Sequence, residues 1–167
     1  MAKKVLVLVN QVQGRPAPYL NRLREAGFEV KLSGLDRLPT EDELIKLLPG
    51  VFGTIAGGEP YTERVFAASP DLKIVARFGV GYDQVDVAAA TRHGVPVAMA
   101  FGTNHESVAD GAFMLMAASA CNLPVQHQLV KSGGWGCNFH PGIWKKTLGI
   151  IGMGRIGRAL ARRCSRG

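Results

Sequence analysis

Short apolar runs alternate with amphipathic segments along the first hundred residues of the chain. The runs are rich in Val, Ile and Leu, as buried strands are, whereas apolar residues in the other segments recur every three or four positions, as in helices. Strands are predicted over residues 4–10, 28–33, 53–58, 72–79 and 95–100, and helices over 17–27, 39–50, 61–70 and 84–94. This β-α-β alternation predicts an α/β fold in which helices sandwich a parallel sheet.

The predicted helix over 39–50 carries a complete start signal. Thr40 is an N-cap residue, and Glu43, three positions later, completes a capping box in which each side chain bonds the other residue's backbone N–H. We therefore expect this helix to begin directly after Thr40.

The pattern changes at Phe101. Residues 105–120 are predicted to form a long helix, apolar on more than one face, that leads from a first domain (1–100) into a second (101–167). Residues 123–146 are rich in Gly and Trp and are predicted to be irregular, although such long loops are uncommon inside compact domains. This segment is either functional or an arm that packs on a partner. A strand over 147–152 and a helix from Arg155 onward are predicted next.

Gly152, Gly154 and Gly157 form a G-x-G-x-x-G pattern between that strand and that helix. In a dinucleotide-binding turn the first glycine permits the tight turn, the second lets the pyrophosphate approach the backbone, and the third lets the helix pack closely. The N–H groups of Arg155 and Ile156 would then face the pyrophosphate. A glycine-rich turn without a ligand is the alternative. The acidic residue that would separate NAD from NADP is expected about 20 positions further on, beyond the sequence.

A second glycine pair, Gly79-Val80-Gly81, follows the predicted strand over 72–79. Consecutive backbone N–H groups at the carboxyl end of a parallel strand can bind a carboxylate, and open α/β sheets bind their ligands at this end. The alternative is a plain turn in which Asp83 or Asp86 caps the next helix.

Composition narrows the range of partners. Apolar residues make up 47% of the chain and charged residues 20%, as in a globular protein, and the net charge of +7 owes much to five arginines between Arg155 and Arg166. The sequence carries no nucleic-acid-binding motif and no apolar run of about 18 residues, so neither nucleic acid nor membrane is an expected partner. Three scattered cysteines, Cys121, Cys137 and Cys164, indicate neither a metal site nor disulfides and favour the cytoplasm.

Three blocks of sequence resemble one enzyme family when they are taken together. "ARFGVGYDQVDVAAATRHGVPVA", "GTNHESVADGAFMLM" and "KTLGIIGMGRIGRALA" are similar, in order and spacing, to the D-isomer-specific 2-hydroxyacid dehydrogenases. The resemblance implies a flavodoxin-like substrate domain followed by the start of a Rossmann domain that binds NAD, with NADP not excluded. It also implies a homodimer built partly through the 123–146 arm and a small 2-hydroxy or 2-oxo acid as substrate.

The resemblance also assigns roles to residues. Val80 and Gly81 would hold the substrate carboxylate, and Asn104 would line the substrate pocket. Val108 would lie on the nicotinamide side, and residues Gly152, Gly154, Arg155, Ile156 and Gly157 would form the pyrophosphate turn. Ala56 and Gly57 stand where a substrate-binding arginine would be sought, and Asp110-Gly111 departs from the family's Glu followed by a larger residue.

The family's catalytic arginine, glutamate and histidine have no counterpart in this chain, and neither His105 nor His140 should take over the role of the histidine. We therefore expect the chain to represent the N-terminal part of a hydride-transferring oxidoreductase and to be inactive alone. A non-catalytic binding or dimerisation module derived from the same family is the alternative.

Overall fold

The computed structural model of the chain describes residues 2–13, 15, 17–136 and 139–165. It divides the chain into two compact units, Met1–Phe101 and Gly102–Gly167, which we call the sheet unit and the helical unit. Their boundary lies one residue from the one predicted between 100 and 101. The functional roles predicted for the two domains stay predictions.

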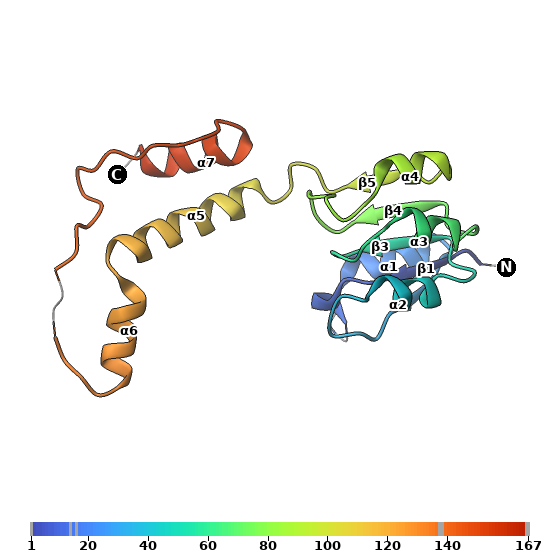
Figure 1. The fold of residues 1–167 in the computed structure, drawn as a ribbon, viewed down its shortest axis with the longest axis horizontal. Coiled ribbons are helices and arrows are strands. Elements are labelled where there is room, and N and C mark those ends of the chain that lie inside the picture. The colour runs from blue at the N-terminus through green and yellow to red at the C-terminus, as the bar shows by residue number, and fades with distance from the viewer. Residues whose placement is uncertain (1, 14, 16, 137–138, 166–167) are drawn as a thin grey trace. The chain divides into compact units, whose positions relative to one another are not determined.

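The sheet unit contains five strands joined by helices (Figure 1). Its elements are β1 (Lys4–Val7), the short 3-10 helix η1 (Asn10–Val12), α1 (Pro18–Glu25), β2 (Glu29–Leu32), α2 (Glu41–Leu47), β3 (Gly53–Ala56), α3 (Glu63–Ala67), β4 (Ile74–Arg77), α4 (Val87–Arg92) and β5 (Val97–Met99). The predicted alternation is confirmed, with every strand shorter than its sequence pattern.

All neighbouring strands pair in parallel, in the order β2-β1-β3-β4-β5. This is the order of flavodoxin-like sheets, so the predicted fold class is confirmed. The strand that precedes Gly79 is β4, and it lies inside the sheet between β3 and β5. The carboxyl ends of these three strands therefore meet at one edge.

Alternation along the strands divides the core into two clusters. Leu6 and Leu8 of the first strand segment join the larger cluster with residues of α2, α3 and α4, whereas Val7 and Val9 join a smaller cluster with Leu20 of α1. Successive strand residues point to opposite faces of a sheet, so each face receives its own helices. The capping box is confirmed as well: the Thr40 hydroxyl accepts from the Glu43 N–H at 3.4 Å, and the Glu43 carboxylate accepts from the Thr40 N–H at 2.8 Å.

The helical unit consists of α5 (His105–Ala120), α6 (Leu123–Lys131) and α7 (Arg155–Cys164). The predicted helix over 105–120 is confirmed. The prediction that all of 123–146 is irregular is wrong, because residues 123–131 are helical. The overall content of Gly and Trp concealed a helix start with Pro124 in the first turn, and the apolar residues Val125 and Leu129 stand one turn apart.

The predicted strand over 147–152 is also wrong, because these residues form neither a helix nor a strand. Its apolar run resembles a buried strand, but the described part of the helical unit offers no second strand to pair with it, and an unpaired strand is unstable in water. Ile151 is consequently fully exposed.

Two further predictions concern cysteines and membranes. Cys121 and Cys164 are free thiols, whereas Cys137 lies outside the described residues. Within the described ranges, no single helix is long and apolar enough to cross a membrane; α5 and α6, bent by 66° at the break between them, pass that test only as a pair, by length and composition.

Candidate functional site

The start of the loop after β4 is fixed by two backbone hydrogen bonds to segments on either side of it. The Phe78 N–H donates to the Ala56 carbonyl at the end of β3 (2.8 Å), and the Gly79 carbonyl accepts from the Ala100 N–H just beyond β5 (3.0 Å). The segment Gly79–Gly81 therefore sits at the carboxyl edge of the sheet, where parallel α/β sheets bind ligands.

The predicted carboxylate-binding groups lie in this loop. Among the described residues, neither the Val80 N–H nor the Gly81 N–H donates to a protein acceptor. The Gly81 carbonyl, by contrast, accepts from Arg77 Nε at 2.8 Å. The two donors are thus available to a ligand while the neighbouring acceptor is occupied.

The alternative interpretation of this loop is also partly confirmed. The Asp86 carboxylate accepts from the Ala89 N–H at 2.8 Å and caps α4, whereas Asp83 does not serve as the cap. Neither Gly79 nor Gly81 has a positive φ, and a Cβ on Gly79 would meet nothing within 4 Å. The backbone conformation therefore does not require either glycine, and a helix cap and an anion site can share this loop.

A buried polar cluster lies beside the loop. The Tyr61 hydroxyl donates to Thr54 Oγ1 at 2.8 Å, and both carboxylate oxygens of Glu59 accept from the Gly57 N–H, at 3.1 and 3.0 Å. Glu59 is only 1% exposed. Burial is the largest influence on its pKa and raises it, against the lowering effect of backbone N–H groups and of the Arg77 charge. Burial likewise raises the pKa of Tyr61 well above its ordinary value.

Ala56 and Gly57 stand where a substrate-binding arginine would be sought, so no arginine side chain is present there. Ala56 is buried, and its carbonyl lies 3.5 Å from Arg77 Nη1, at the outer limit of a hydrogen bond. The guanidinium at this edge comes instead from β4. Sequence reasoning missed Arg77 and Glu59, although a lone arginine in an apolar strand and a lone glutamate directly after one were visible signals.

The glycine turn in the helical unit is closely packed at its third glycine and open at its second. Gly152 has φ of 95°, which favours glycine, and a Cβ on Gly157 would lie 2.1 Å from the Gly152 carbonyl oxygen. A Cβ on Gly154 would meet nothing within 4 Å, so the backbone there is open to a ligand. Gly154 is the N-cap of α7, which means that the first-turn N–H groups, such as that of Ile156, have no acceptor within the helix.

The residues predicted beside this turn stand at the start of α5. Asn104 is the N-cap and does not use its side chain as a cap, and its carbonyl accepts from the Val108 N–H at 2.9 Å. Asn104 and Val108 are exposed and one turn apart. A Cβ on Gly102 would lie 4.0 Å from Arg155 Cζ, so the segment before α5 approaches the start of α7.

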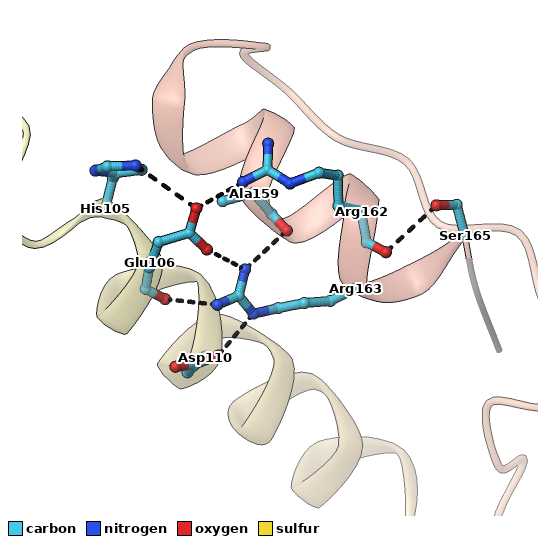
Figure 2. A network of polar contacts seen from close by, with 7 residues as sticks. All are labelled: His105, Glu106, Asp110, Ala159, Arg162, Arg163 and Ser165. Atoms are coloured by element: carbon cyan, nitrogen blue, oxygen red, sulfur yellow. Dashed lines mark hydrogen bonds and ion pairs between the residues drawn. The ribbon is translucent and has the colours of Figure 1, made fainter.

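An ion-pair network holds α7 against α5 (Figure 2). Arg163 donates to Asp110 (2.6 Å), to the Glu106 carboxylate (2.7 Å) and to the Glu106 carbonyl (3.1 Å), and Arg162 also donates to Glu106 (2.6 Å). The hydrogen bond from Arg163 is the main reason that the pKa of Glu106 is lowered. Asp110, which departs from the family pattern, is thereby held in the helix pair.

The described residues do not form a metal site, since no group of three His, Cys, Asp or Glu among them could hold an ion. His105 Nε2 lies 3.6 Å from Glu106, and its Nδ1 is buried without a partner among the described residues. His93 caps the end of α4 and pairs with Glu63 at 2.7 Å.

Comparison with known proteins decides the family. The family described as "D-isomer specific 2-hydroxyacid dehydrogenase, catalytic domain" matches residues 6–149. The chain belongs to this family. The resemblance read from the sequence is confirmed.

Named relatives and solved structures agree with this assignment. The chain is 38% identical to the glyoxylate reductase of Korarchaeum cryptofilum over 135 residues, which are 77% of this chain and 38% of that protein. The NAD-dependent formate dehydrogenase of Staphylococcus aureus, solved with NAD, gives a TM-score of 0.83 at 29% identity. The match covers 96% of this chain and 52% of the formate dehydrogenase chain.

A third protein is the NADPH-dependent glyoxylate/hydroxypyruvate reductase of Sinorhizobium meliloti, solved with NADP and malonate. It gives a TM-score of 0.73 at 30% identity, and the match covers 99% of this chain and 50% of the reductase chain. The chain therefore spans about half of each solved structure and 38% of the Korarchaeum cryptofilum glyoxylate reductase. The two solved structures hold different cofactors, NAD in one and NADP in the other.

Proposed function

We propose that this chain supplies the substrate-carboxylate loop and the first phosphate-binding turn of an oxidoreductase that transfers hydride between NAD or NADP and a small D-2-hydroxy acid or 2-oxo acid. Family membership supports the reaction class. The observation that carries the site is the loop at the carboxyl edge of the sheet, where the Val80 and Gly81 N–H groups have no acceptor among the described residues.

Val80 and Gly81 bind the substrate carboxylate through their N–H groups in this proposal. Charge-assisted hydrogen bonds of this kind fix the orientation of a small acid, so that its 2-carbon is presented in one position. Asn104 lines the substrate pocket and Val108 the nicotinamide side.

The glycine turn fits a dinucleotide. Gly157 admits no Cβ and Gly154 leaves the backbone open, as a pyrophosphate-binding turn requires. Gly152, Gly154, Arg155, Ile156 and Gly157 would hold the pyrophosphate, with first-turn N–H groups and the positive helix end stabilising its charge. The bound nicotinamide supplies or accepts the hydride.

The chain alone is proposed to lack turnover. Hydride transfer to a 2-oxo acid needs a positioned proton donor, which contributes about 10² to 10⁴-fold. The histidine of the sheet unit, His93, does not meet this need at the edge loop, because it caps the opposite end of α4 and pairs with Glu63. The homodimer and the cytoplasmic location remain predictions, and no comparison supports the alternative of a non-catalytic module.

The direct test of the site is a titration of the ¹⁵N-labelled 167-residue chain with glyoxylate, followed by amide chemical shifts. We expect the largest shifts at Val80 and Gly81, with weak affinity, a dissociation constant on the order of 1 mM, or about −4 kcal/mol. Glycolaldehyde, which lacks the carboxylate, is the matched control and should shift neither amide. Equal shifts with both compounds, or none with glyoxylate, would refute the site.

A further inference from the structure

Arg77 contacts backbone carbonyl groups in two segments, the loop after β4 and the end of β3. It is the last residue of β4, and its Nε donates to the Gly81 carbonyl at 2.8 Å while Nη1 lies 3.5 Å from the Ala56 carbonyl at the end of β3. Within the described residues, no carboxylate forms an ion pair with this guanidinium. The side chain therefore acts on backbone and is not part of a surface ion pair.

Glu59 is a buried carboxylate on the adjacent segment. It follows β3 by three residues, is 1% exposed, and accepts from the Gly57 N–H with both carboxylate oxygens. A carboxylate removed from water without an ion-pair partner is costly unless nearby charge and donors compensate. The positive charge that acts on it is that of Arg77.

Tyr61 pairs the segment after β3 with the segment after β4 through backbone hydrogen bonds. Its N–H donates to the Gln84 carbonyl (2.7 Å), and its carbonyl accepts from the Asp86 N–H (2.8 Å), which forms a parallel bridge between the segment after β3 and the segment after β4. The polar groups Glu59, Tyr61 and Arg77 thus come from neighbouring segments at one edge of one sheet.

We infer that Arg77 and Glu59 are positioning residues for the substrate loop: Arg77 holds the Gly81 carbonyl, which leaves the Val80 and Gly81 N–H groups for the substrate carboxylate. Glu59 accepts from the Gly57 N–H and so fixes the segment whose Ala56 carbonyl Arg77 approaches. This inference rests on the proposed function, because the substrate is assigned there. In physical terms, the protein binds the acceptor of this loop, the Gly81 carbonyl, and leaves its two donors, the Val80 and Gly81 N–H groups, for an anion.

The geometry also explains why an arginine suits this position. The planar fork of a guanidinium directs several N–H groups at fixed angles, so one side chain can reach two carbonyls at once. A lysine would keep the positive charge but would not hold both carbonyls. Arg77→Lys therefore separates the electrostatic attraction of a cation for the anionic substrate from the positioning of the loop.

The test uses the 167-residue chain and three variants, Arg77→Met, Arg77→Lys and Glu59→Gln, with Lys73→Met as matched control. Lys73 precedes the amino end of β4 and donates to the Pro70 carbonyl, so its removal deletes a cation at the opposite end of the same strand. Urea unfolding first establishes that each variant is folded.

Two readouts then follow. In the absence of ligand, ¹⁵N relaxation should show greater mobility of residues 80–82 in Arg77→Met and Glu59→Gln than in the parent chain and in Lys73→Met. The dissociation constant for glyoxylate should rise about tenfold in Arg77→Met, as expected for losing about 1.4 kcal/mol, less in Arg77→Lys and Glu59→Gln, and not at all in Lys73→Met.

The outcomes distinguish the two proposals. Unchanged loop mobility and unchanged glyoxylate affinity in Arg77→Met overturn the inference while leaving the carboxylate site intact. Increased loop mobility without any glyoxylate shift at Val80 and Gly81 in the parent chain overturns the proposed site and leaves the positioning role supported by mobility alone. A rise in the dissociation constant that is equal in Lys73→Met also overturns the inference, because general electrostatic attraction then explains it.

Discussion

Different interactions stabilise the sheet unit and the helical unit internally. Nearly all buried apolar side chains lie in the sheet unit, and the described part of the helical unit contributes only Ala109 and Ala159 to them. In that unit Leu115 is 73% exposed and Trp135 95% exposed, and α5 and α7 are joined by the network of Glu106 with the arginines of α7. Burial of apolar area dominates folding free energy, whereas exposed ion pairs contribute little.

This difference bears on function. The loop proposed to bind the substrate carboxylate is fixed by strands inside a packed sheet, so its geometry follows from the core. The glycine turn depends on the contact of Gly157 with Gly152 and on α7 being held by α5. We therefore expect the substrate loop to be the more rigid of the two candidate sites.

The difference between the two units predicts that substitutions in the core of the sheet unit have the largest effect on the free energy of unfolding. Phe66 is buried in the main cluster between α3 and the sheet, so Phe66→Ala should lower the free energy of unfolding by about 3–5 kcal/mol. Leu115→Ala, in exposed helix, should change it by less than about 0.5 kcal/mol. Urea unfolding followed by far-ultraviolet circular dichroism measures both. A similar loss for the two variants would show that α5 is buried in solution.

Sequence patterns predicted the sheet unit well because each strand there finds the neighbours that its pattern requires. The strand predicted over 147–152 has the same kind of pattern but no strand to pair with among the described residues, and pattern alone cannot supply that information. The α6 helix was missed because Gly and Trp beyond it dominated the segment. Arg77 and Glu59 could not be assigned roles from sequence, since their contacts depend on which strands are neighbours.

A second prediction concerns the glycine turn. Gly157→Ala places a Cβ 2.1 Å from the Gly152 carbonyl oxygen and should displace the start of α7. Amide hydrogen exchange in α7 should then accelerate at least about tenfold, equivalent to about 1.4 kcal/mol of lost local stability. Gly154→Ala, where a Cβ meets nothing within 4 Å, is the matched control and should leave exchange unchanged. Equal protection in the two variants would contradict the packing described for this turn.

A third prediction uses the opposite pKa shifts of two glutamates. Burial raises the pKa of Glu59, so its contribution to stability is complete below the unfolded pKa and is lost as pH rises through the folded pKa. The hydrogen bond from Arg163 lowers the pKa of Glu106, so its contribution is present above the unfolded pKa and is lost as pH falls through the folded pKa.

Substitution should expose these opposite signs. Relative to the parent chain, Glu59→Gln should become more stable as pH rises from acid to neutral, whereas Glu106→Gln should become less stable over the same change. Urea unfolding of both variants across that range measures the difference, and the effect at the exposed Glu106 should be the smaller. Parallel pH profiles for the two variants would show that one of the two environments is misassigned.

The most direct measurement of the central claim is a crystal structure of the chain with oxamate, an unreactive analogue of a 2-oxo acid. The account predicts that oxamate carboxylate oxygens lie about 2.7–3.2 Å from the backbone nitrogens of Val80 and Gly81, with Arg77 still bound to the Gly81 carbonyl. Oxamate bound elsewhere, or Arg77 released from Gly81 to take the carboxylate itself, would contradict the account.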